Sequence, residues 1–410
     1  MRPLRPPRAD LPVTPLERAF REERAQVVAT LARRLGDLQL AEDAVSEAFA
    51  AAAATWPSAG VPDRPGAWLT TTAWRKALDA VRRDRSTPGT VDIPVPAAPE
   101  PGLQEEDALL QLVLICCHPA LAIEARVALT LRHVAGLSVA EIAAGFLVPE
   151  ETMAKRLVRA RTKIRQNAIS FELPGTEGLA ERVSSVQAVL YLVFTEGHLA
   201  SGSGPAVRTD LCEEAIWLAR QLHRLLPDDA ETTGLLALML LQHSRADARH
   251  DDAGHLVSFA EQDRSRWDLA AVAEARALLA TTGRGPVGPY QVQAATAALH
   301  AAATRADDVN WSRIADLYGL LHRLAPSPVV TVNRAVAVGR ADGPRAALAL
   351  LAPVLADGRL EGYPPLHAAY ADLLERAGQH EDAVAAWRRA AESARNPAEQ
   401  AALARRAADR

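Results

Sequence analysis

The sequence predicts an all-α protein. Ala, Leu and Arg, which favour helices, are abundant, whereas aromatic residues make up only 4% of the chain. Apolar residues recur at helical intervals through most of the 410 residues. With 49% hydrophobic residues, a chain of this length can bury the cores of two or three domains.

The first part of the chain predicts a flexible arm and one small helical domain. Residues 1–15 contain five prolines and no apolar run, so we expect an arm without regular structure. Residues 16–85 then follow a helical pattern, with a turn at Gly36 and Asp37 and a loop at 57–65. We expect the first helical domain to cover 16–85.

Residues 86–107 predict an extended linker. This segment has five prolines, five acidic residues and no basic residue, and it shows no helical period. Such a segment has too little apolar surface to fold by itself. It therefore separates two helical domains.

A helix-turn-helix is predicted within the next domain, 108–170. In "LSVAEIAAGFLVPEETMAKRLVRARTKIRQ", Ser138 and Glu141 have capping-box spacing, so a helix begins there. Pro149 interrupts that helix, and a second helix begins at Glu150 with acidic residues in its first turn. Two helices joined by a short break are typical of this DNA-binding motif.

The second helix has one apolar face and one basic face. The apolar residues are Met153, Leu157, Ala160 and Ile164. Five cations lie beside and opposite them: Lys155, Arg156, Arg159, Lys163 and Arg165. These cations suit a DNA major groove and its phosphates. A solvated amphipathic helix within a bundle is the alternative interpretation, because basic faces are common.

Residues 171–410 predict a domain of helical repeats. Ala371, Gly378, Ala383, Trp387 and Ala390 have the spacing of a tetratricopeptide helix pair. Such pairs stack because one pair alone cannot bury its apolar face. The segment "EQDRSRWD" gathers charged residues that could be catalytic, although a structural ion-pair network is the commoner arrangement.

Composition restricts the location and chemistry of the protein. No run of 18 apolar residues occurs, and the N-terminal segment lacks the apolar core of a secretory signal. Three cysteines fit a reducing cytoplasm. The pair Cys116 and Cys117 has no second half of a zinc site, so we expect no metal. The C-terminal part shows no catalytic signature, so we also expect no cofactor and no catalytic residue.

Two motifs in order resemble a known family. "LAEDAVSEAFAAA" is similar to the region 2 signature of extracytoplasmic-function RNA polymerase sigma factors, and the helix-turn-helix is similar to their region 4. The resemblance covers residues 16–166, and the remainder looks like the subgroup with a tetratricopeptide-like extension. The sequence departs from the family pattern at two sites: Ser46 replaces a Gln, and the pair Trp74 and Arg75 replaces an Arg-Asn pair.

The resemblance implies partners and residue roles. A sigma factor catalyses no reaction; it binds core polymerase through the β′ clamp helices and the β flap, and it binds promoter DNA. For the β′ clamp helices the implied acidic patch is Glu42, Asp43 and Glu47. For the −10 element the implied residues are Trp74, Arg75, Arg82 and Arg83. For the −35 element they are Thr152, Lys155, Arg156 and Arg159.

The role of the C-terminal domain allows several interpretations. Residues 1–170 carry a formal charge of +2 and the remainder carries −6, so an acidic domain could regulate the basic one intramolecularly or through a regulatory protein. An operator-binding regulator with a ligand- or partner-sensing repeat domain is an alternative, although the region 2 motif argues against it. An enzyme or scaffold with an incidental helix-turn-helix is a third possibility.

Overall fold

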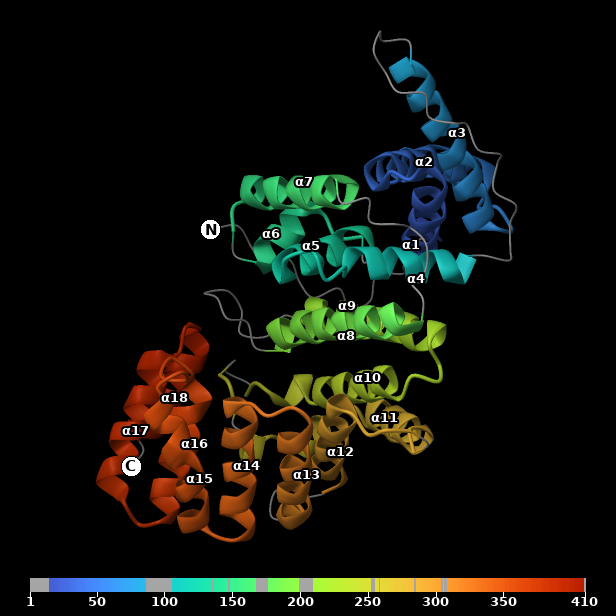
Figure 1. The fold of residues 1–410 in the computed structure, drawn as a ribbon. Helices are drawn as coiled ribbons and strands as arrows, with labels where there is room; N and C mark the ends of the chain where they lie inside the picture. The colour runs from blue at the N-terminus through green and yellow to red at the C-terminus, as the bar shows by residue number, and fades with distance from the viewer. Residues whose placement is uncertain are drawn as a thin grey trace. The chain divides into compact units, whose positions relative to one another are not determined.

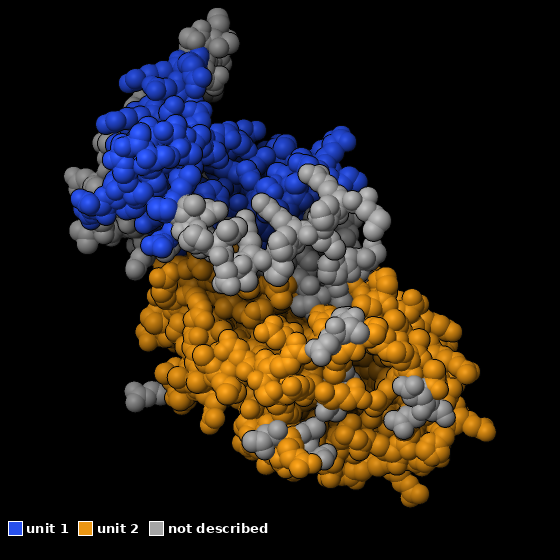
Figure 2. Space-filling view, turned by 180° about the vertical axis from the view of Figure 1, so that it is seen from behind, with its two compact units in different colours: residues 1–189 blue, residues 190–410 orange. Residues whose placement is uncertain are grey.

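The chain divides into two compact units, residues 1–189 and 190–410 (Figure 2). The computed structural model describes 15–85, 105–134, 136–146, 148–166, 176–198, 209–251, 255–257, 259–283, 285–303, 305 and 308–408. Across these ranges the secondary structure is helical, apart from one isolated bridge between His250 and Leu256, which confirms the all-α prediction. None of the described helices is both long and apolar enough to cross a membrane.

The first unit includes both segments that were predicted to be small helical domains (Figure 1). Its helices are α1 (Pro15–Leu35), α2 (Leu38–Ala59), α3 (Pro65–Arg85), α4 (Glu105–Cys116), α5 (Ile123–His133), α6 (Val139–Gly145), α7 (Glu150–Gln166) and the start of α8 (Thr176–His198). Helix α1 packs against α2, α3 and α4, while α5, α6 and α7 pack together. The predicted arm covers 1–15 and the predicted linker 86–107, and of these 1–14 and 86–104 lie outside the described residues. The ends of both predictions are wrong, because α1 begins at Pro15 and α4 begins at Glu105.

Local sequence explains the tight turn between α1 and α2. Gly36 has φ of 66°, a left-handed conformation that glycine adopts without steric cost, and it ends α1. The Asp37 carboxylate then accepts hydrogen bonds from the backbone N–H groups of Gln39 and Leu40 and so caps α2. The turn predicted at these two residues is therefore confirmed.

The second unit is a succession of packed helices. They are the rest of α8, then α9 (Thr209–Leu225), α10 (Ala230–His243), α11 (Leu269–Thr281), α12 (Pro289–Ala302), α13 (Trp311–Leu324), α14 (Pro328–Ala341), α15 (Pro344–Asp357), α16 (Pro364–Arg376), α17 (His380–Ser393) and α18 (Pro397–Ala408). Short 3₁₀ turns occur at 246–248, 259–261 and 264–266. Proline begins α12, α14, α15, α16 and α18, where its fixed φ suits a first helical turn.

Two contacts bring α10 and α12 together. A Cβ at Gly234 would lie 2.8 Å from the backbone N of Gln291, so only glycine permits this close approach. The Glu231 carboxylate on α10 accepts hydrogen bonds of 3.0 Å from the backbone N–H groups of Tyr290 and Gln291. Glu231 therefore caps α12 from a neighbouring helix.

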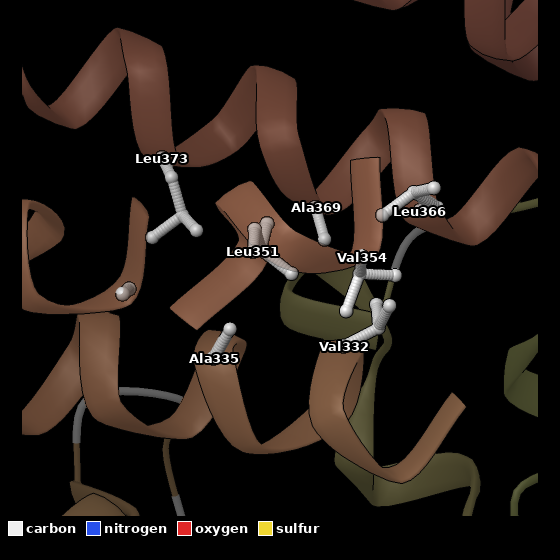
Figure 3. Packing of buried hydrophobic residues seen from close by; sticks show 8 residues of the cluster. Val332, Ala335, Leu351, Val354, Leu366, Ala369 and Leu373 are labelled. Carbon is white, nitrogen blue, oxygen red and sulfur yellow. The ribbon is translucent and has the colours of Figure 1, made fainter. Parts of the chain in front are cut away.

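The C-terminal helices enclose a continuous apolar core (Figure 3). Val332 of α14, Leu351 and Val354 of α15, and Leu366 and Leu373 of α16 meet in one cluster. The pair α16 and α17 buries the small residues singled out in the sequence, which are Ala371, Ala383 and Ala390. Trp387 fills the space beside them, and its indole N–H donates to Glu375 at 2.8 Å.

Candidate nucleic-acid and polymerase interface

Helices α6 and α7 form the predicted helix-turn-helix. The Ser138 N–H donates to the Glu141 carboxylate at 2.8 Å, and the Glu141 N–H donates to the Ser138 hydroxyl at 3.1 Å. These reciprocal bonds confirm the capping box. Met153, Leu157 and Ile164 are buried on α7, as the apolar face predicts.

The basic face of α7 is largely accessible. Thr152, Lys155 and Arg159 are exposed, although Lys155 has an ion pair of 2.7 Å with Glu151. Arg156 is half-buried, with its guanidinium 5.5 Å from the centre of the Phe146 ring. Three of the predicted −35 residues are therefore available to a DNA groove, and the fourth also packs on its own domain.

The predicted −10 residues divide into exposed cations and a buried aromatic ring. Arg75, Arg82 and Arg83 are exposed on α3, and Arg82 lies 3.7 Å from Asp79 in a surface ion pair. Trp74 is only 4% exposed. The implied contact of Trp74 with the −10 element is wrong for this conformation, because its side chain is buried within the domain.

The half-buried Trp68 also belongs to this packing. Its ring makes an edge contact with Trp56, with the ring centres 5.5 Å apart. Both tryptophans described on α3 thus pack within the domain, and neither is exposed enough to serve as a stacking platform.

The predicted acidic patch also divides. Asp43 and Glu47 are exposed on α2, four residues apart and so on one face, and Glu47 lies 3.5 Å from Lys76. Glu42 is only 1% exposed. The prediction of a three-residue exposed patch is therefore wrong in Glu42, which lies on the inner face of α2.

Glu42 is the centre of a buried cluster that joins α1 and α2 to α5 and α7. Its carboxylate lies 3.5 Å from Arg24, 3.1 Å from the Nδ1 of His133 and 4.0 Å from Arg161, and it also pairs with Arg132. Arg24 further donates to the His133 carbonyl at 3.2 Å. We call these five residues the Glu42 cluster. It connects the domain that resembles region 2 to the domain that resembles region 4.

The electrostatics of the Glu42 cluster favour an ionised carboxylate. Burial alone would raise the pKa of Glu42, but the close His133, Arg132 and Arg24 outweigh burial and hold the pKa below its ordinary value. Burial lowers the pKa of His133, in opposition to Glu42, and lowers that of Arg24 to about 10. The carboxylate and Arg24 are therefore charged at neutral pH, whereas His133 is neutral.

Acid is expected to weaken the first unit through His133 and then through Glu42. The pKa of His133 is lower in the folded state than in the unfolded chain. As the pH decreases below about 6.5, the unfolded chain therefore takes up a proton that the folded protein does not, and the free energy of unfolding decreases. A lowered carboxyl pKa removes further stability below about pH 4.5. Thermal unfolding of the first unit between pH 7 and 5 should therefore depend more steeply on pH in the wild type than in His133→Asn. Equal slopes would contradict this assignment.

The first half of α8 is bound to the second predicted domain. The Ser185 hydroxyl donates to the Cys117 carbonyl at 2.7 Å and accepts from Arg126 at 2.9 Å. Cys116 and Cys117 are buried thiols, and burial raises the pKa of Cys117 to about 12, so the pair is unreactive. Within the described ranges, no three His, Cys, Asp or Glu side chains converge as a metal site.

Comparisons with known proteins agree with these two domains. Residues 19–87 match the model of sigma-70 region 2, residues 111–164 match sigma-70 region 4, and residues 182–282 match a family of unknown function, DUF6596. An uncharacterized protein of Rhizobium meliloti (strain 1021), R00370, is 42% identical over 398 residues, covering 94% of this chain and 93% of that protein. No solved structure matches the chain.

Sigma-70 regions 2 and 4 define the coarse function. Proteins with these regions are transcription factors, not enzymes, and they act in promoter recognition with core RNA polymerase. Both regions occur here in the family order, followed by a further helical domain. The chain therefore belongs to the sigma-70 family, as a sigma factor of the extracytoplasmic-function type with a C-terminal extension.

Proposed function

We propose that this sigma factor recognises a −35 element with α7 and a −10 element with α3. The observation that carries the proposal is the exposed basic face of α7, which stands opposite its buried apolar face in a capped helix-turn-helix. The −35 contacts to base edges and nearby phosphates would come from Thr152, Lys155, Arg156 and Arg159. On α3, Arg75, Arg82 and Arg83 would follow the DNA backbone at the −10 element.

Asp43 and Glu47 are proposed to bind the β′ clamp helices of the polymerase. Both are exposed acidic residues on one face of α2, which suits a basic partner surface. The domain carrying the helix-turn-helix is proposed to bind the β flap, as the family relationship implies. Glu42 joins the acidic surface only when the cluster that buries it opens.

Simultaneous binding of both promoter elements requires the Glu42 cluster to open. Elements at −35 and −10 are roughly 25 base pairs apart, or about 85 Å at one 34 Å turn per 10 base pairs. A compact unit of 189 residues has a radius of gyration of about 16 Å and cannot span that distance. The two sigma domains therefore separate on the promoter, which exposes Glu42 to the polymerase.

Charge reversal on α2 tests the polymerase contact. Asp43→Lys with Glu47→Lys should abolish co-migration of the protein with core polymerase in gel filtration, because like charges would then face the clamp helices. Asp316→Lys, an exposed position on α13, is the matched control and should co-migrate normally. An operator-binding regulator would not co-migrate in any form, so failure of the wild type would favour that alternative.

The C-terminal extension is proposed to be tetratricopeptide-like and to regulate the sigma domains. The packed helix pairs that run to α18 and the small-residue contact between α16 and α17 support this assignment. A deletion that tests it should begin after His198, because α8 contributes to the first unit through Ser185. We expect the deletion to change activity or promoter choice in transcription in vitro. Unchanged activity and choice would contradict regulation by this domain.

A further inference from the structure

The second unit contains a cavity of about 250 Å³ that the sigma function does not use. Residues of α8, α10, α12, α13 and α14 line it, together with the 3₁₀ segments between α10 and α11. Helices α10 and α12 are fixed against each other here by Gly234 and by the Glu231 cap. Two of the helices that line the cavity are thus fixed relative to each other.

One wall carries a positive charge for which the described residues supply no anionic partner. Burial, with smaller contributions from the nearby cations Arg249 and Arg264, lowers the pKa of Arg245 to about 10, so Arg245 is still charged at neutral pH. Its guanidinium lies 4.8 Å from the centre of the Phe259 ring and 3.5 Å from the Gln262 side-chain oxygen. Among the described residues, no carboxylate lies within ion-pair distance of it. A desolvated cation in this setting favours an anionic ligand.

Flat aromatic surfaces form other parts of the wall. Phe259, Trp267, Tyr191 and Tyr318 all line the cavity. Arg264 supports this wall: it lies 4.6 Å from the centre of the Trp267 ring and donates to the His300 and Ala303 carbonyls at 2.7 Å. The segment "EQDRSRWD" therefore contributes to the wall, and its Arg264 is structural.

Polar atoms that could orient a ligand are also present. The Trp267 Nε1 and the His300 Nδ1 are buried and have no hydrogen-bond partner among the described residues. Burial lowers the pKa of His300 to about 4, so its imidazole is neutral and leaves Arg245 as the charged group that lines the cavity. Native proteins seldom bury such polar atoms without a partner, so these two atoms are candidates to bind a ligand.

We propose that this cavity binds a small aromatic carboxylate. The carboxylate would pair with Arg245, and the ring would lie against Phe259 and Trp267. The volume is below the range of about 300–1,000 Å³ typical of drug-sized ligands, so one ring or a fused pair fits better than a nucleotide. This inference rests on the cavity alone and does not depend on the proposed promoter contacts.

Calorimetric titration of the full-length protein with benzoate and indole-3-carboxylate tests the proposal. We expect at least one of them to bind, with benzamide, indole-3-carboxamide and inorganic phosphate about 10- to 100-fold weaker, because only the aromatic acids use both the charge and the rings. Absence of binding by both acids would overturn the proposal. Equal binding of an acid and its amide would overturn the role assigned to Arg245.

Three variants separate ligand binding from folding. Arg245→Met should weaken binding about 10- to 100-fold while the Tm of the ligand-free protein is unchanged or raised, because a desolvated cation is removed. Arg323→Met, on the exposed surface of α13, should bind as the wild type does. Ala297→Leu keeps Arg245 but fills the cavity, and it should also abolish binding. Normal binding by Arg245→Met or by Ala297→Leu would contradict the site.

Discussion

Replacing Glu42 with alanine is expected to lower the stability of the contact between the two sigma domains by about 3–5 kcal/mol. The substitution removes the carboxylate from a cluster in which Arg24 and His133 are buried and Arg132 and Arg161 lie close by. The buried guanidinium of Arg24 would then lose its carboxylate, and removing one partner is the costliest way to break a buried ion pair. Few other single substitutions in the first unit should cost as much.

Hydrogen exchange followed by mass spectrometry is the suitable measurement, because a two-unit protein does not unfold in one step. Peptides from α2 and α5 should lose protection in Glu42→Ala, whereas peptides from α16 and α17 should not change. Glu47→Ala is the matched control: it lies on the same helix in an exposed pair with Lys76 and should cost about 0–1 kcal/mol. If Glu42→Ala exchanged like Glu47→Ala, the Glu42 cluster would not hold the two domains together.

Replacing Arg156 and Arg159 together with alanine should reduce binding to the −35 element most strongly. Each bidentate contact of arginine with guanine contributes roughly 1–3 kcal/mol of discrimination, so the double variant should lose sequence preference. Arg159 is exposed, so its removal should affect DNA binding alone. Arg156 also packs on Phe146, so its removal should lower the stability of the helix-turn-helix as well.

Fluorescence anisotropy with a −35 duplex and a scrambled duplex measures both effects. If about five phosphates are neutralised, the logarithmic salt slope should be near −4.5 for the wild type. Arg165→Ala, which removes an exposed cation further along α7, should weaken binding to both duplexes equally and reduce the slope by about 0.9. Wild-type preference in the double variant would show that α7 is not the recognition helix.

Features that depend on neighbouring residues could be predicted from the sequence. The capping box of Ser138 and Glu141 and the buried face of α7 follow from spacings of three and four residues, and both were predicted correctly. The turn at Gly36 and Asp37 follows from the local preferences of those two residues. Local chemistry determines each of these features.

Features that depend on distant residues could not be predicted in the same way. Glu42 follows the acidic pattern of an exposed helix face, but its burial depends on Arg132, His133 and Arg161, about 90 or more residues away. Trp74 lies among surface cations, yet its ring faces the core of its domain. The consecutive Arg132 and His133 at the end of a mostly apolar helix were the one signal that polar groups would be buried there. The cavity draws its walls from separate helices, so no single stretch of sequence indicates it.

The most direct test of the sigma-factor assignment is run-off transcription with core RNA polymerase from the same organism and a library of promoter fragments. The purified full-length protein should yield transcripts from a subset of fragments that share two short elements, and core polymerase alone should yield none from them. Absence of transcripts from every fragment, with no association between the protein and that polymerase, would contradict the assignment.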